Sequence, residues 1–341
     1  MEGIFWAVRK AFLPAKQTLA FSVEYIVDLV MSDNKQMMVA VRVSLISNIV
    51  LFAIKLITLL LVNSLAVAAD LGISAIALAV SGILYYAIKT ADKPADYFHN
   101  YGYGKIENVT EAIEGMVMIG LALAMSVQAI LHFVRPEQVH TPVIGLITSF
   151  IGMIINFWGA NFILKLAERN ASPALQAEGV HFRLEGFISL SITLAFALVI
   201  IFHRWGLSSL ALYVDPAATL IVSAAIAVPS AHLLKQAYIK LLDASIEEGS
   251  QMDVLKALAG HYDRYCDFKN IRTRSAGRKN FVDIHLVVPE HISVKKAHQI
   301  TSALKQDIAS AVAESEVTIH IEPCAKDCAL IKNNQQCPYA N

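Results

Sequence analysis

Long apolar stretches separated by short polar segments occupy most of the chain up to about residue 235. A helix needs roughly 20 apolar residues to cross a bilayer. The stretches that reach this length are 39–62, 64–88, 110–133, 142–167, 180–203 and 210–235. The pattern therefore predicts six transmembrane helices, with a lipid bilayer around most of the chain.

Charged residues become frequent after about residue 240, and no later apolar run reaches spanning length. The periodicity there predicts a helix at 251–262, strands at 268–275 and 280–288, a helix at 294–313 and a strand at 316–322. In the second strand, alternation from Phe281 to Val287 puts one set of side chains on a core face. Two strands, a helix and a strand fit a ferredoxin-like α+β fold.

Composition agrees with a membrane protein, because only 16% of the residues are charged, against about 25% in soluble domains. The net charge of +0 does not orient the chain, but the placement of basic residues does. One side of the predicted membrane carries Arg9, Lys10, Lys16, Lys35, Arg42, Lys89, Lys93, Lys105, Lys165 and Arg169, and the other little more than Arg135 and Arg204. The positive-inside rule then puts both termini in the cytoplasm, and we expect a multi-pass protein of a bacterial inner membrane.

These patterns divide the chain into four parts. They are an N-terminal cytoplasmic arm (1–35), a six-helix transmembrane domain (36–238), a cytoplasmic ferredoxin-like domain (239–324) and a cysteine-containing tail (325–341). In the arm, the mildly amphipathic segment from Ile4 to Phe12 has no signal-peptide cleavage site after it. We interpret it as an interfacial or poorly ordered segment.

Three ionisable residues within the apolar spans can bind a metal ion. Asp70 lies in the second span, and His181 and Glu185 lie one helical turn apart in the fifth. Side chains four positions apart share a helix face, and ionisable residues at this depth are functional by default. Two carboxylates beside a neutral imidazole call for a divalent cation or protons, and this donor set suits zinc, iron, cobalt or manganese.

The alternative to a metal site is a hydrogen bond between Asp70 and His181, with Glu185 reaching the cytoplasmic interface. Other polar residues of the spans have simpler interpretations. Lys55 is expected to be paired or snorkelling, and the asparagines are expected to form hydrogen bonds between helices. These asparagines are Asn48, Asn156 and Asn161.

The soluble part contains further metal ligands. Residues expected to come together when the ferredoxin-like fold packs are His285, His298, His320 and Glu322. His320 and Glu322 share one face of the last predicted strand. Three cysteines follow at Cys324, Cys328 and Cys337, and they are either a soft-metal site or free thiols, since disulfides are rare in a reducing compartment.

Several short motifs, in order, resemble those of the cation diffusion facilitator family, over residues 35 to 324. The aspartate of span two and the histidine-led pair of span five are two of them. Between spans two and three, Lys93-Pro94-Ala95-Asp96 resembles the KPAD motif, and 99–107 resembles the HxxGHGKxE motif. Asp215-Pro216 and Leu241-Leu242-Asp243 occupy matching places around the sixth span.

The resemblance implies a tetrahedral divalent-metal site between spans two and five, with export driven by proton antiport. Asp70, His181 and Glu185 match three ligand positions, and Glu185 is a methylene longer than the usual aspartate. The fourth position is Ser74, whose hydroxyl is a poor metal ligand. Because histidine has a reference pKa of roughly 6.5, His181 is the expected carrier of both proton and metal.

The resemblance also implies sites outside the spans. A loop metal site maps onto Asp96 and His99, with Tyr103 at its third position, so a solvated loop pair is the alternative. The cytoplasmic metal positions are the three histidines and Glu322 named above, while Lys269 replaces one family histidine. Lys105 and Asp243 match a charge contact between subunits, which implies a homodimer.

We therefore expect a secondary active transporter, not an enzyme: a proton-coupled exporter of divalent transition metal, zinc or iron first, with manganese, cobalt and cadmium as further candidates. A metal ion is its substrate and regulator. No organic cofactor and no nucleic acid is expected, and the spans contain neither a nucleophile-base pair nor a phosphate loop. The rival is a non-transporting or partner-dependent membrane metal sensor, which Ser74, Tyr103 and Lys269 favour.

Overall fold

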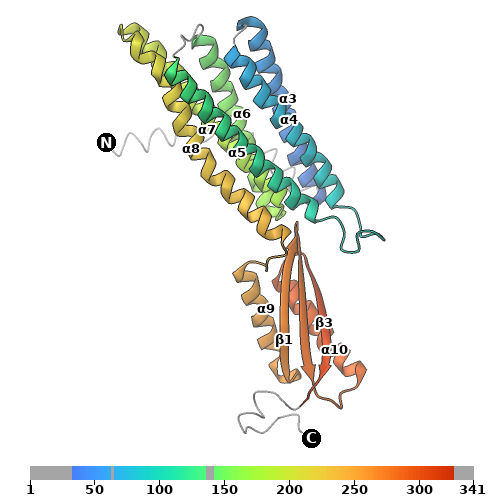
Figure 1. The fold of residues 1–341 in the computed structure, drawn as a ribbon. Helices are drawn as coiled ribbons and strands as arrows, with labels where there is room; N and C mark the ends of the chain where they lie inside the picture. The colour runs from blue at the N-terminus through green and yellow to red at the C-terminus, as the bar shows by residue number, and fades with distance from the viewer. Residues whose placement is uncertain (1–32, 63–64, 136–141, 326–341) are drawn as a thin grey trace, which may run out of the picture.

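The computed structural model describes residues 33–62, 65–135 and 142–325. Six long helices form a bundle, and a small domain with a three-stranded sheet extends from one end of it (Figure 1). The six helices are long and apolar enough to cross a membrane, as the hydrophobic pattern predicts. The arm segment from Ile4 to Phe12 lies outside the described residues.

The bundle helices pack mainly as three close pairs, α6 with α7, α5 with α8, and α3 with α4. Their bounds are α3 (Asp33–Val62), α4 (Leu65–Ala91), α5 (Lys105–Val134), α6 (Pro142–Arg169), α7 (Pro173–Arg204) and α8 (Ser208–Leu241). Several begin or end beyond the predicted apolar spans, at the end of the bundle nearest the C-terminal domain. The polar residues at these ends remain helical, because a helix can continue past the apolar residues that cross the membrane.

The start of α7 illustrates such an extension. The span is predicted from residue 180, but the helix begins at Pro173. Ser172 is its N-cap, and the Ser172 hydroxyl accepts a hydrogen bond from the Leu175 backbone N–H. A serine cap followed by proline at the first helical position is a strong start signal, so the capping residues, not the apolar run, decide where α7 begins.

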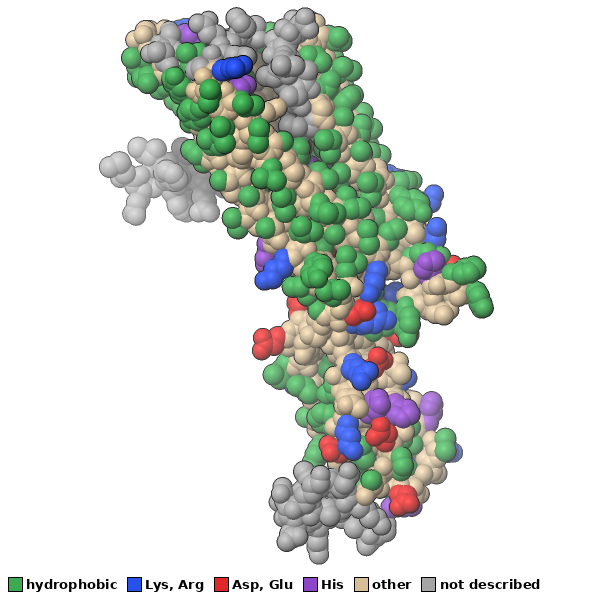
Figure 2. Space-filling view, viewed as in Figure 1, with side chains coloured by type: hydrophobic (Ala, Val, Ile, Leu, Met, Phe, Trp, Pro, Cys, Tyr) green, Lys and Arg blue, Asp and Glu red, His purple; other side chains and the backbone are tan. Residues whose placement is uncertain are grey.

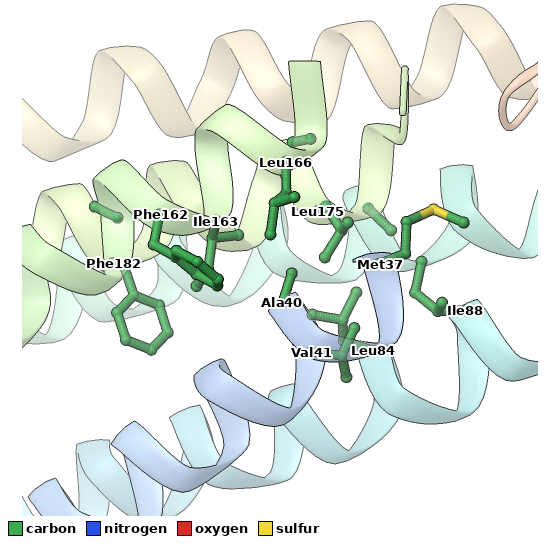
Figure 3. Close-up of a cluster of buried hydrophobic side chains, with 13 residues drawn as sticks. Met37, Ala40, Val41, Leu84, Ile88, Phe162, Ile163, Leu166, Leu175 and Phe182 are labelled. Atoms are coloured by element: carbon green, nitrogen blue, oxygen red, sulfur yellow. The ribbon is translucent and has the colours of Figure 1, made fainter. Parts of the chain in front are cut away.

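A cluster of buried apolar side chains joins α3, α4, α6 and α7 (Figure 3). Met37, Leu84, Ile163, Leu175 and Phe182 are among its fully buried members. The outward faces of the bundle helices carry many exposed apolar side chains (Figure 2). A bundle that is apolar outside as well as inside is suited to lipid rather than water.

The C-terminal domain layers two helices on one face of its sheet. Its elements are α9 (Glu248–Gly260), a 3-10 turn (Tyr262–Arg264), β1 (Asp267–Ala276), β2 (Lys279–Val288), α10 (Val294–Ala311) and β3 (Ser315–Pro323). The order β1-β2-β3 combines an antiparallel and a parallel pair. The parallel pair is joined through α10, as a crossover requires, and the predicted ferredoxin-like arrangement is confirmed.

The tip of the β1–β2 hairpin contacts the start of α5, and we call this contact the hairpin joint (Figure 1). The Gly277 backbone N–H donates to Asn108 Oδ1 at 2.8 Å. Arg278 donates from Nε to Glu107 Oε1 at 2.9 Å and from Nη2 to Asp92 Oδ1 at 2.5 Å. Gly277 has a φ of +61°, which glycine adopts without strain. The joint ties the sheet domain directly to the bundle.

Candidate metal centres

The central candidate site is on α7, where His181 and Glu185 lie one turn apart. His181 Nε2 lies 3.2 Å from Glu185 Oε1, and the side chains are 3% and 14% exposed. The contact is an ion pair when His181 is protonated. His181 Nε2 has no hydrogen-bond partner among the described residues. A buried nitrogen without a partner is costly, and a bound cation would remove that cost.

Two neighbouring helices contribute polar groups to this centre. Lys55 of α3 and Asn156 of α6 both interact with the Glu185 carboxylate. Lys55 is therefore paired inside the bundle, as its simpler interpretation predicts, and the Asn156 amide Oδ1 is buried without a hydrogen-bond partner among the described residues. The centre thus carries one positive side chain beside its acidic group.

The remaining two predicted positions of this site lie on α4. Ser74 is buried, with 5% of its surface exposed, and α4 contacts α7 in the bundle. The side chain of Asp70 lies outside the described residues. Convergence of Asp70 with His181 and Glu185 therefore stays a prediction.

Sequence reasoning missed a group of buried glutamates near the central site. They are Glu107, Glu111 and Glu114 on α5 and Glu178 on α7. The Glu178 carboxylate accepts hydrogen bonds from the hydroxyls of Ser44 and Ser81, the second at 2.7 Å. The available signal was the presence of acidic residues inside or beside apolar spans, which marks functional positions in the same way as Asp70 does.

The loop between α4 and α5 brings Asp96 and His99 together, but uses their groups internally. Asp96 Oδ2 accepts from the Tyr103 hydroxyl at 2.5 Å, and Oδ1 accepts from the Phe98 and His99 backbone N–H groups at 2.9 and 2.7 Å. The Tyr103 hydrogen bond is the largest cause that lowers the pKa of Asp96 below its usual value. Both carboxylate oxygens already have donors, so the geometry favours the solvated loop pair over a metal site.

The C-terminal domain does assemble a ligand cluster, from β2 and β3. Nitrogen and oxygen atoms of His285, His320 and Glu322 lie within 4.8 Å of one another. His285 Nδ1 is 2.6 Å from Glu322 Oε1, and this hydrogen bond is the largest cause that lowers the pKa of Glu322. Register explains the convergence, because His285 is paired directly with His320 on the neighbouring strand.

Within one chain, His298 lies outside that cluster, so the structure brings together three of the four predicted ligands. It lies exposed on α10, with Nε2 3.4 Å from the Ser302 hydroxyl on the same helix. The apolar face of α10 packs on the core side of the sheet, where Ile284 and Leu286 point. His285 alternates with these residues, so its side chain is on the opposite face from α10. Histidines are visible on this domain in Figure 2.

The other predicted ligands lie near the ends of elements. Cys324 follows β3 directly and is partly buried, while Cys328 and Cys337 lie outside the described residues. Lys269 is paired with His285 across β1 and β2, and its charge acts on Glu322. Lys269 therefore lies beside the cluster, in the place where the resemblance expects a ligand.

Lys105 and Asp243 form an ion pair within one chain, with Nζ 2.9 Å from Oδ1. Asp243 lies two residues after the end of α8. It has a φ of +57°, and its Oδ1 also lies 3.6 Å from Arg274 Nη1 of β1. The pair thus joins the start of α5 to the end of α8 inside one subunit. Its part in a contact between subunits stays a prediction.

Comparisons with known proteins agree with this architecture. The profile described as "Cation efflux transmembrane domain" matches residues 41–242, and that described as "Cation efflux protein, cytoplasmic domain" matches residues 247–324. The chain is 25% identical to the cation-efflux pump FieF of Shewanella oneidensis, over 83% of this chain and 93% of that protein. It is 28% identical to the manganese efflux system protein MneP of Bacillus subtilis, over 82% and 94%.

An uncharacterised transporter of Synechocystis is also similar, at 26% identity over 73% of this chain and 78% of that protein. These relatives span most of the chain, including both the helical bundle and the sheet domain. The matches therefore concern the whole architecture and not a single motif.

Proposed function

The chain belongs to the cation efflux family, whose members are also called cation diffusion facilitators, and on that basis we propose that it exports a divalent transition metal in exchange for protons. It is a multi-pass integral membrane protein and a cation transporter, not a classical enzyme. The observation that carries the proposal is the buried His181 Nε2, without a hydrogen-bond partner in the described chain and 3.2 Å from Glu185 Oε1.

The chemistry of exchange follows from these two side chains. A neutral imidazole binds a transition metal, and a protonated one does not. Arrival of a proton on His181 therefore releases the ion, and arrival of the ion releases the proton. Asp70 would complete the charge balance from α4, with water or Ser74 in the fourth position.

Zinc and iron(II) are the first candidates for the cargo, because mixed nitrogen and oxygen ligands suit both. Manganese accepts the same ligands with more weight on oxygen, and the similarity to MneP supports including it. Cobalt and cadmium complete the set to be measured.

The sheet domain would act as the regulatory part of a homodimer. His285, His320 and Glu322 would bind a regulatory ion, and the match to the family's cytoplasmic domain supports both the dimer and the location of this domain. We place the protein in a bacterial inner membrane with both termini in the cytoplasm, and we keep the division into parts at 1–35, 36–238, 239–324 and 325–341.

The test is metal uptake into proteoliposomes with an imposed pH gradient, for zinc, iron(II), manganese, cobalt and cadmium. We expect gradient-dependent flux of at least one metal, and its loss in His181→Ala. His232→Ala is the matched control, since His232 is an exposed histidine on α8 that bonds Gln236. Flux that persists in His181→Ala would overturn the proposed site.

The second candidate function is a membrane metal sensor with a degenerate transport site. Ser74 at a ligand position favours it, as does a cytoplasmic cluster that is assembled in the fold. The same experiment separates the two functions. Absence of flux for every metal, with metal bound by the sheet domain of folded protein, would establish the sensor.

A further inference from the structure

Two glutamates from different helices meet inside the bundle, one turn from the central site. Glu114 is on α5 and Glu178 is on α7, three residues before His181. The exposed fractions of the two residues are 0% and 1%. The two helices pack together at this level, because Met118 of α5 and Ala177 of α7 belong to one buried cluster. The two carboxyl groups interact with each other, and we call them the glutamate pair.

The two members of the glutamate pair have different surroundings. Glu178 accepts hydrogen bonds from the hydroxyls of Ser44 on α3 and Ser81 on α4, and the Asn48 amide in turn donates to Ser81 at 2.7 Å. Neither carboxyl oxygen of Glu114 has a hydrogen-bond partner among the described residues. The Glu178 carboxylate is thus held in place by two hydroxyls, whereas the Glu114 carboxyl group next to it is not.

A contrast on the same helix shows what is missing. Glu111, one turn before Glu114, is also buried, but Lys240 of α8 lies 3.1 Å from its Oε1. Glu107, a further turn away, forms an ion pair with Arg278 and accepts a hydrogen bond from the Ser172 hydroxyl. No such cation faces Glu114 among the described residues. Burying an uncompensated carboxylate is expensive, so the pair must bind either a cation or a proton.

We infer that the glutamate pair is a second divalent-cation site, through which the ion passes between the central His181 site and the side of the membrane that faces the C-terminal domain. Its ligands would be the two carboxylates, with the Ser44 and Ser81 hydroxyls in reach of Glu178. All of these donors are oxygens, which suits manganese among the transition metals. The location follows from α7, which begins beside the hairpin joint and reaches Glu178 before His181.

This inference rests on the proposed transport function for its meaning, but its test is equilibrium binding. Purified full-length dimer or monomer in detergent is titrated with Mn²⁺, and free ion is counted by electron paramagnetic resonance. We expect Glu114→Gln with Glu178→Gln to remove one bound Mn²⁺ per chain. The same loss is expected in a His181→Ala background, because the two sites are separate.

The control is Glu111→Gln, which removes a buried acid of the same helix whose charge Lys240 already compensates. We expect this variant to keep the full Mn²⁺ count. Folding of each variant is checked by thermal unfolding and size-exclusion elution. If the double variant does not fold, the single Glu114→Gln variant replaces it, with at least a tenfold loss of affinity expected at the pair.

An unchanged Mn²⁺ count in folded Glu114→Gln and Glu178→Gln protein would overturn the inference and leave the pair as a proton-sharing dyad. Flux measurements keep this failure apart from failure of the proposed function. If wild type binds Mn²⁺ at the pair but moves no metal, the transport proposal falls and the site stands. If wild type transports and the pair variants bind Mn²⁺ normally, the inferred second site falls and the transport proposal stands.

Discussion

The central site and the sheet-domain cluster use the same kinds of ligand in opposite surroundings. In the bundle, the His181 and Glu185 side chains are 3% and 14% exposed. On the sheet, the side chains of His285 and Glu322 are 35% and 33% exposed, and His285 Nδ1 is already 2.6 Å from Glu322 Oε1. Water can therefore solvate the charges of the sheet-domain cluster but not those of the central site.

This difference suits two tasks. An enclosed site must change its bound charge whenever the ion leaves, because an empty buried site is unfavourable. In the proposed exchange, that requirement is what would couple metal to protons. A half-exposed cluster can fill and empty with the ion concentration around it, which is the behaviour that the proposed regulatory role would need.

The largest expected effect separates the two sites by function. His181→Ala should lower flux by on the order of 100-fold or more, because it removes the only nitrogen ligand predicted in the bundle. Metal binding by the sheet domain should be unchanged. Proteoliposome flux and equilibrium binding on the same preparation measure both, and equal losses of flux and sheet-domain binding would argue against two independent sites.

The hairpin joint connects the two regions, and Arg278→Ala should break it. The Glu107 carboxylate, 1% exposed as a side chain, would keep Ser172 but lose Arg278. Removing one partner of this largely buried ion pair should destabilise the fold by about 3 kcal/mol. Chemical denaturation in detergent measures the loss. Arg264→Ala is the control, since Arg264 is half exposed and lies 3.9 Å from Asp263; an equal loss there would contradict the role of the joint.

Substitution of the sheet-domain ligands should affect regulation more than transport. His285→Ala should weaken metal binding by the domain about tenfold or more, since two ligands remain. Flux at saturating metal should change only slightly. His298→Ala is the matched control, because His298 is outside the cluster. Equal effects of the two variants would support the predicted four-ligand site, with His298 as a ligand.

Ser74→Asp sharpens the comparison from the other direction, because it adds a carboxylate to the bundle. If Ser74 faces the central site, the extra ligand should tighten metal binding by about tenfold and shift selectivity among metals. Competition binding of zinc, iron(II) and manganese measures the shift. Ser81→Asp is not a suitable control, because Ser81 bonds Glu178. Unchanged affinity and selectivity in folded Ser74→Asp protein would show that position 74 faces elsewhere.

The smallest expected effect concerns the exposed loop between α4 and α5, where hydrogen bonds already compensate the charge of Asp96. The pKa of Asp96 is lowered chiefly by the Tyr103 hydroxyl, so this interaction stabilises the fold above the ordinary aspartate pKa. The contribution is lost as pH falls through the lowered pKa. Tyr103→Phe should therefore lower thermal stability slightly near pH 6, and the difference from wild type should shrink as pH falls below the ordinary aspartate pKa and through the lowered one. A difference that persists at low pH would point to packing of the ring instead.

The sequence predicted the fold well because its signals are local. Six apolar runs specify six helices, and period-two alternation specifies β2 to within a residue of its observed bounds. The helix ends were less well predicted. At α7, the Ser172 cap and Pro173 extend the helix seven residues before the apolar run begins at 180.

The candidate sites show the same difference between contacts within one element and contacts between elements. His181 with Glu185 was predictable, because a helix puts residues four apart on one face whatever surrounds it. His320 with Glu322 was predictable from the strand period, and the strand register puts His285, a third predicted ligand, beside His320. The exclusion of His298 was decided only by which face of the sheet α10 covers.

The glutamate pair shows most clearly what only the tertiary structure could decide. Glu114 and Glu178 are 64 positions apart on helices whose order does not specify their packing. Whether an acidic residue in a span meets a lysine, as Glu111 meets Lys240, or another acid depends on the rotation and offset of each helix. Sequence periodicity determines neighbours within one element, and side-chain packing between elements determines the rest.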